Sequence, residues 1–188
     1  MAYDTYGNYC VNVEGRKPTY SACIADFTPA ASATDIITIT GATNKTITIT
    51  NIRFSGSATA STYQGMYLFK RSSLDSGGTS TPTTMVPHDS KDILPSAVVY
   101  QYSVNPSSLG TSVGLVRSDH LSLPAAGGAS NVPSSSAVIW DFCDRSAKGI
   151  KLQSSTEQLG ISLNGMIVPA GINLHITIEW TEEITSVT

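Results

Sequence analysis

The chain has 188 residues, of which 40% are hydrophobic and 13% charged, and its net charge at pH 7 is −3. A chain of this length can form one domain that buries about 70% of the surface its unfolded form exposes, so a stable core is expected without disulfides. The few Lys and Arg residues form no basic stripe, and no apolar run approaches the ~20 residues of a membrane span. We therefore expect neither a nucleic-acid partner nor a membrane partner.

Charged residues are about half as frequent as the roughly 25% that is typical, so the surface must be made largely of Ser, Thr, Gly and Asn. Such a surface suits a protein that packs against neighbours. The N-terminus has no basic start and no apolar block, so we expect no secretory signal. Three widely spaced cysteines, Cys10, Cys23 and Cys143, favour thiols made in a reducing cytoplasm over a disulfide framework or a metal knuckle.

Residues 1–33 show no sustained period and are interpreted as an irregular N-terminal arm. Tyrosine is enriched at protein interfaces because it adds contact area at small entropic cost. The arm's tyrosines are therefore candidate partner-interface residues, namely Tyr3, Tyr6, Tyr9 and Tyr20. The alternative is a terminus that is disordered or packed on its own domain.

The clearest pattern follows the arm. Ile alternates with Thr over residues 35–40 and again over 45–54, with Gly41–Asn44 between the two runs. Alternation of this kind places apolar side chains on one strand face and hydroxyls on the other, and the break predicts a hairpin. We expect the Ile face to be core and the Thr face to be wet or intersubunit.

Seven further strands are predicted, separated by Gly, Pro, Asn and Ser turns, and no segment has a helical apolar stripe. They are residues 64–71, 97–104, 113–121, 138–142, 149–152, 158–163 and 173–181. Short strands at this spacing indicate an all-β fold, an antiparallel β-sandwich of jelly-roll type. The domains expected are the arm, 1–33, and the sandwich, 34–188.

Several clusters invite a catalytic interpretation. His88, Asp89 and Ser90 are adjacent, but triad members meet through the fold, and the chain lacks a GxSxG turn. We expect Asp89 to cap loop amides. His88, His120 and His175 match no metal-ligand spacing, and His175 alternates outward with Thr177 and Glu179.

The C-terminal carboxylates Glu179 and Glu182 resemble a glycosidase pair in composition only, since strand geometry would not oppose them across a sugar. We expect them to be charged decoration of a strand end. Trp140 and Phe142 share one strand face and are predicted core anchors. The glycine pairs at 77–78 and 127–128 lack nucleotide-loop spacing. We therefore expect no enzyme, no catalytic residue, no cofactor and no metal.

Several segments together resemble small β-rich virion structural proteins of tailed bacteriophages and prophages. They are Leu68–Ser72, Val86–Ser90, Ala97–Val99, Leu115–Asp119, and above all Leu159–Gly171 with Leu174–Glu183. The resemblance covers about residues 34–183. It implies a jelly-roll-like capsid decoration or cement protein that is oligomeric on the virion surface, with the N-terminal arm reaching onto neighbouring capsid subunits. The leading hypothesis is a virion structural protein, made in the host cytoplasm, that binds the major capsid protein as a homotrimer.

Two other functions remain open from the sequence. A tail-associated or fibre-associated module, or a carbohydrate-binding domain, could hold a host glycan in loops at one end of the sandwich. The loops at 72–85 and 124–136 contain no aromatic residue, which disfavours sugar stacking there. A small hydrolase would need Ser90 or another serine within about 3 Å of a histidine that a carboxylate orients.

Overall fold

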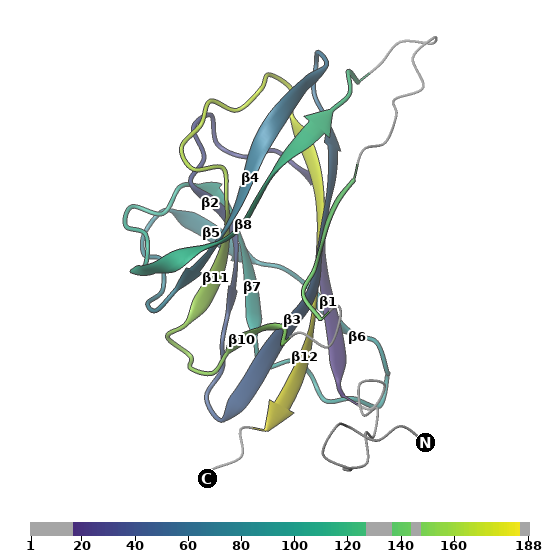
Figure 1. Ribbon diagram of the computed structural model, residues 1–188, viewed down its shortest axis with the longest axis vertical. Helices are drawn as coiled ribbons and strands as arrows, with labels where there is room; N and C mark the ends of the chain where they lie inside the picture. The colour runs from purple at the N-terminus through teal and green to yellow at the C-terminus, as the bar shows by residue number, and fades with distance from the viewer. Residues whose placement is uncertain (1–16, 127–136, 144–147, 185–188) are drawn as a thin grey trace, which may run out of the picture.

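The computed structural model describes residues 17–126, 137–143 and 148–184 (Figure 1). Within these residues the structure has no helix, and its strands form two antiparallel sheets packed face to face, which confirms the predicted β-sandwich. The strands are β1 (Thr19–Phe27), β2 (Asp35–Thr40), β3 (Lys45–Ser57), β4 (Thr62–Arg71), β5 (Thr79–Pro82), β6 (Met85–Pro87), β7 (Val98–Val104), β8 (Ser112–Leu123), β9 (Val138–Asp141), β10 (Ile150–Leu152), β11 (Gln158–Ser162) and β12 (Asn173–Ile184).

The sheet order is that of a jelly roll. One sheet has the order β10-β3-β12-β1-β6, with β9 also paired to β3, and the other has the order β5-β7-β2-β11-β4-β8. Without β5, β6 and β7, and with β9 and β10 taken as one interrupted strand beside β3, the chain changes sheet at every step except from β4 to β8, which pair with each other. This is the strand order of the two Greek keys of a jelly roll. The jelly-roll prediction is therefore confirmed.

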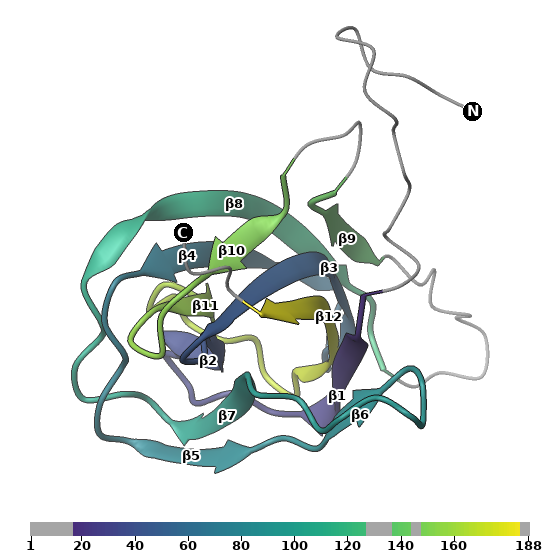
Figure 2. The same ribbon diagram turned by 90° about the horizontal axis from the view of Figure 1, so that it is seen from below.

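The three remaining strands belong to one excursion of the chain between β4 and β8. In it, β7 pairs with β2 and β5 pairs with β7, while β6 pairs with β1. Figure 2 shows β5, β6 and β7 along one side of the sandwich and β8 along the opposite side. The excursion thus covers the edges of β1 and β2 and leaves the β8 side open.

The core lies between the inner faces of the sheets and consists mostly of isoleucine, leucine and aromatic side chains. Trp180 of β12 stacks on Tyr20 of β1, with ring centroids 5.9 Å apart. Phe54 meets Trp140 edge to face at 4.7 Å. Each of these contacts joins two neighbouring strands of the sheet that contains β3, which we call the β3 sheet. Trp140 and Phe142 are buried, as predicted.

The predicted hairpin of residues 35–54 is wrong, because β2 and β3 belong to different sheets. The chain crosses between sheets at Gly41, where a Cβ would lie 2.2 Å from the Ser154 carbonyl oxygen, so only glycine fits. The Thr face also differs from the expectation. Thr38, Thr46 and Thr48 are 1–7% exposed, so these hydroxyls are buried.

The boundary of the N-terminal arm must also be corrected. Residues 19–27 form β1, which pairs with β12 over most of its length, so the sandwich begins no later than Thr19. The strand was not predicted from the sequence, because Ser21, Ala22, Cys23 and Ala25 are too small to produce a strong alternation of apolar and polar residues. The short strands β5 and β6 were not predicted either, because both lie in a stretch rich in Thr and Pro that is typical of loops.

Candidate interaction surface

Strand β8 is the longest edge strand of the described sheets. The other edge strands, β5, β6, β9 and β10, have three or four residues each, whereas β8 has 12. Short edges are protected against pairing with other chains, and a long edge offers unpaired N–H and C=O groups. The described part of the molecule is therefore most open to strand addition at β8.

The C-terminal half of β8 is engaged within the chain. The Arg117 guanidinium donates a hydrogen bond to the Asp141 carbonyl oxygen at 3.4 Å and lies 5.5 Å from the centre of the Phe142 ring. The Asp119 carboxylate accepts a hydrogen bond from the His120 backbone N–H at 2.8 Å. An edge amide capped in this way is not available to a partner strand.

The N-terminal half of β8 carries apolar side chains and no charge. Val113, Leu115 and Val116 are 63%, 51% and 39% exposed. Leu109, just before the strand, is exposed as well and lines the same surface hollow as Ser112. We call Leu109 and residues 112–116 the open edge.

The outer face of β4, beside β8, carries a row of aromatic side chains. Gln64, Met66 and Leu68 point into the core, so the alternate residues Tyr63, Tyr67 and Phe69 face outward. Tyr63 is 60% exposed, and its ring lies 4.9 Å from that of His120. We call these three residues the aromatic row.

Two surface hollows lie along the aromatic row. The first, of about 300 Å³, is lined by Tyr67, Ser118, Asp119 and His120. The second, of about 280 Å³, is lined by residues that include Phe69, Leu109, Ser162 and Asn164. These volumes lie at the lower end of the range for small-ligand sites.

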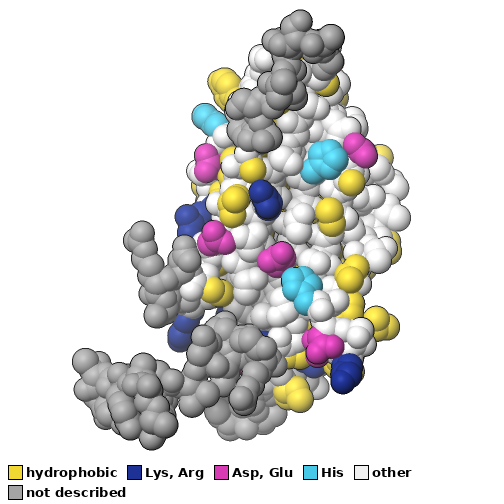
Figure 3. Space-filling view, turned by 90° about the vertical axis from the view of Figure 1, so that its right-hand side faces the viewer, with side chains coloured by type: hydrophobic (Ala, Val, Ile, Leu, Met, Phe, Trp, Pro, Cys, Tyr) yellow, Lys and Arg dark blue, Asp and Glu magenta, His cyan; other side chains and the backbone are white. Residues whose placement is uncertain are grey.

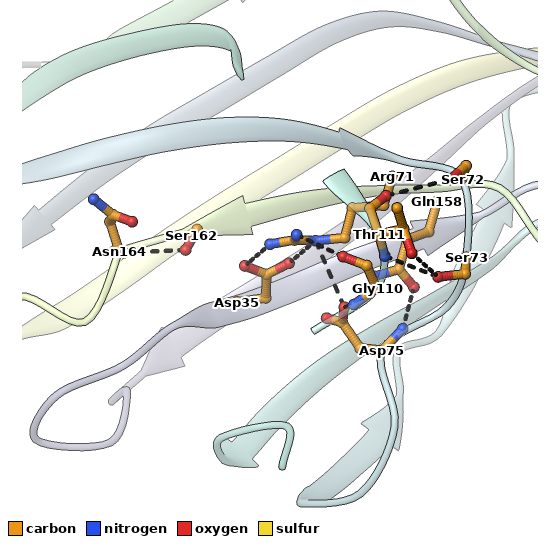
Figure 4. Close-up of polar contacts among 10 residues, drawn as sticks. All are labelled: Asp35, Arg71, Ser72, Ser73, Asp75, Gly110, Thr111, Gln158, Ser162 and Asn164. Atoms are coloured by element: carbon orange, nitrogen blue, oxygen red, sulfur yellow. Dashed lines mark hydrogen bonds and ion pairs between the residues drawn. The ribbon is translucent and has the colours of Figure 1, made fainter. Parts of the chain in front are cut away.

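A buried ion pair lies at the end of β4 (Figure 4). Arg71 donates two hydrogen bonds to Asp35 of β2, from Nε to Oδ2 at 2.8 Å and from Nη2 to Oδ1 at 2.9 Å. Arg71 is 4% exposed and Asp35 is fully buried. Gly160 makes room for this pair, because a Cβ there would lie 2.2 Å from Asp35 Oδ2.

The ion pair also holds two loops, 72–78 and 105–111, over the sheet. Arg71 Nη1 donates to the Gly110 carbonyl oxygen at 3.0 Å, and Gly110 N donates to Asp75 Oδ1 at 2.7 Å. The Asp75 backbone N–H donates in turn to Gln158 Oε1 at 3.1 Å. The network ties strand and loop backbones together, which is a structural role.

Asp75 is the perturbed titratable group of this network. Burial of its carboxyl raises its pKa to about 6, helped by the nearby Asp35 carboxylate and opposed by hydrogen bonding from Gly110 and by the charge of Arg71. Its Oδ2 atom is buried and accepts no hydrogen bond from a described donor. A proton on Asp75 is thus favoured by the fold.

Tyr20, one of the four tyrosines predicted to contact partners, is a core residue. Tyr20 is 1% exposed, and its hydroxyl donates to the Ile93 carbonyl oxygen at 2.9 Å. The interface prediction for Tyr20 is therefore wrong, because β1 places its side chain between the sheets. Tyr3, Tyr6 and Tyr9 lie outside the described residues.

The structure keeps His88, Asp89 and Ser90 in an exposed loop after β6. Asp89 Oδ1 accepts a hydrogen bond from the Lys91 backbone N–H at 2.9 Å, which is the capping role predicted for it. The Thr19 carbonyl oxygen accepts a hydrogen bond from the His88 backbone N–H at 2.8 Å, so this loop is fastened to β1.

The other predicted clusters are dispersed. His175 faces outward, 49% exposed, with Nε2 3.6 Å from Asp26 Oδ1, while His120 lies on the other sheet. Cys23 and Cys143 are exposed, and Cys10 lies outside the described residues. Within the described ranges, no three His, Cys, Asp or Glu side chains are grouped so that they could hold a metal ion, and no helix is long and apolar enough to cross a membrane.

Glu182 differs from the surface decoration expected of it. Alternation along β12 places Glu182 on the same inward face as Trp180, and it is 2% exposed. Its Oε1 atom accepts hydrogen bonds from the Ser96 and Ala97 backbone N–H groups, at 2.9 and 3.0 Å, and from Trp180 Nε1 at 3.1 Å. These donors fix the carboxylate and tie the loop before β7 to β12.

Charge is sparse on the described surface. Figure 3 shows the side of the molecule on which β1 and β6 lie, and its few charged side chains are scattered among uncharged ones. The aromatic row was not predicted, although Tyr67 and Phe69 alternate within the predicted strand 64–71 and Tyr63 directly precedes it. No family model matches the chain, and neither a curated protein nor a solved structure with significant similarity was found.

Proposed function

We propose that the chain is a non-catalytic structural subunit that assembles with other subunits through the open edge. The observation that carries this proposal is that some edges of the sandwich are covered by other strands and one long edge is not. The excursion between β4 and β8 covers β1 and β2, whereas the N-terminal half of β8 stays uncovered in the described part of the chain. Exposed edges that are long and apolar pair with other chains.

The open edge offers two kinds of contact to a partner. Backbone N–H and C=O groups of residues 112–116 can extend the sheet by one strand, which provides affinity through main-chain hydrogen bonds. Val113, Leu115 and Leu109 add apolar area beside that strand. A stable interface buries about 1,600 Å² in total, so surfaces next to the edge must also take part.

The proposed setting is the virion of a tailed bacteriophage, where the chain would decorate and stabilise the capsid. The sequence resemblance supports this setting, and jelly rolls recur in viral capsid proteins as well as in lectins. The proposed partners are the major capsid protein and further copies of this chain. In a closed homotrimer the open edge would contact a different surface of the next copy, as a heterologous interface requires.

A structural role also agrees with how the chain's reactive groups are used. The Asp35 carboxylate is bound by Arg71 through two hydrogen bonds, and that of Glu182 by three N–H donors. Each of these side chains fastens a loop or a neighbouring strand to a sheet.

Electron microscopy of purified virions tests the setting. We expect density for the sandwich on the outside of the capsid, with β8 against a neighbouring subunit. Particles carrying Leu115→Lys should lose occupancy, whereas Ile139→Lys, a change at a half-exposed position of β9, should keep it. Finding the protein only as a free monomer in infected cells would refute the virion role.

A further inference from the structure

We infer that the aromatic row and its two hollows bind an oligosaccharide of several hexose units. Tyr63, Tyr67 and Phe69 project from one face of a single strand, so their spacing is fixed by the backbone. At about 3.3 Å per residue, Tyr63 and Tyr67 are about 13 Å apart along β4, and Tyr67 and Phe69 about 7 Å. A row of this length suits a chain of linked sugar rings better than a single sugar.

The Tyr63 ring is the most accessible part of this surface. Its side chain is 60% exposed and packs against the His120 ring, which limits its rotation. A tyrosine ring offers an apolar face for the C–H groups of a pyranose and a hydroxyl at its tip. Because the Tyr63 ring is already held in place, binding a sugar to it costs less conformational entropy than binding to a freely rotating ring would.

Gly65, between the two tyrosines, is buried beneath the Tyr67 ring and Met166. It occupies the outward position between them on β4, opposite His120 of β8. A Cβ at this position would lie 3.1 Å from the Tyr67 ring and 3.3 Å from Met166 Sδ. The absence of a side chain at position 65 therefore lets the Tyr67 ring pack against the backbone of β4, beside the first hollow.

Polar groups beside the row match the hydroxyls of a sugar. The first hollow has the Ser118 hydroxyl, the Asp119 carboxylate and the His120 imidazole, and the second has Ser162 and Asn164. Hydroxyl, carboxylate, imidazole and amide groups placed around aromatic faces supply both the apolar and the polar contacts that a glycan needs.

A glycan fits this face better than a peptide does. A peptide that added to the sheet would use the unpaired backbone of an edge strand, but β4 is paired on one side with β11 and on the other with β8. Its outer face offers side chains only. The inference does not depend on the proposed assembly role, because Tyr63, Tyr67 and the first hollow lie outside the open edge, which shares only Leu109 and Ser112 with the second hollow.

Isothermal titration of the full chain tests the site, with hexasaccharides of glucose, galactose and mannose in α and β linkage as probes. We expect at least one probe to bind, Tyr63→Ala to weaken that binding about tenfold or more, and Tyr63→Phe to restore it. Ile139→Ala, at a half-exposed position of the other sheet, is the matched control and should leave binding unchanged.

Three results would overturn the inference. The first is that no probe binds at millimolar concentration. The second is that binding survives both Tyr63→Ala and Tyr67→Ala in variants that keep the melting temperature of the wild type. The third is that Tyr63→Ala abolishes self-association, which would show that a second copy occupies the row. Loss of assembly in Leu115→Lys with sugar binding intact would separate this site from the assembly role.

Discussion

Arg71 and Asp35 form a bidentate ion pair, with both N–O distances between 2.8 and 2.9 Å, although 36 residues separate them in the chain. The pair lies under loops 72–78 and 105–111, which approach each other through hydrogen bonds between Ser76 and Ser108. The ion pair therefore anchors these two loops to the sheet, as apolar side chains hold the two sheets together. Its energetics give the most direct tests of the fold.

Removing one partner of the pair should destabilise the protein strongly. Arg71→Met leaves the Asp35 carboxylate buried without its cation, and the expected loss in the free energy of unfolding is about 3–5 kcal/mol. Urea denaturation of the purified protein measures this loss. The matched control is Arg53→Met, at an exposed position of β3, which should cost less than about 0.5 kcal/mol. Equal effects of the two changes would show that the ion pair is not an anchor.

Gly160 should tolerate no side chain. Because a Cβ there would overlap Asp35 Oδ2, Gly160→Ala must displace the ion pair, and we expect it to cost about 1–3 kcal/mol. Gly114→Ala in β8 is the control, since nothing lies within 4 Å of a Cβ at that position. A melting temperature that falls in the control as much as in Gly160→Ala would contradict the packing described around Asp35.

Asp75 should make stability depend on pH. Its pKa is raised from 3.8 to about 6 in the folded protein, so the folded state holds the proton more tightly than the unfolded state. The resulting stability is fully present below about pH 4 and is lost as the pH rises through 6. We expect the loss between pH 4.5 and pH 8 to be about 1–2 kcal/mol.

Comparison with Asp75→Asn isolates this effect from other titrations. Asparagine cannot ionise, so the variant should lack the part of the pH dependence that lies between 4 and 6. The groups that act on the charge at position 75 are Asp35 and Arg71, and both are retained in the variant. Identical slopes of unfolding free energy against pH in the two proteins would rule out a raised pKa at Asp75.

Much of the fold was predictable from the sequence because local alternation specifies strands. The Ile and Thr runs located β2 and β3, and all seven of the later predicted strands are present. Alternation does not say which sheet a strand joins, however. The crossing at Gly41 depends on close contact with Ser154, more than 100 residues away, and no local pattern reports such a contact.

The surfaces that now carry functional proposals were harder to predict. Whether an edge is open depends on which strands the excursion covers, and that is a property of the whole topology. The burial of Tyr20 and of Glu182 likewise follows from the pairing of β1 with β12 and from the loop before β7, which covers Glu182. In each case the residue type indicated which contacts the side chain can make. Only the fold determines whether solvent or a partner can reach that side chain.

Sedimentation velocity of the purified chain, over about 1–100 μM, tests assembly through the open edge most directly. We expect a homo-oligomer that Leu115→Lys converts to a folded monomer, because a lysine at this half-exposed position places charge in the interface. Ile139→Lys should leave the oligomer intact. A wild-type protein that stays monomeric throughout, or an oligomer indifferent to Leu115→Lys, would contradict assembly through β8.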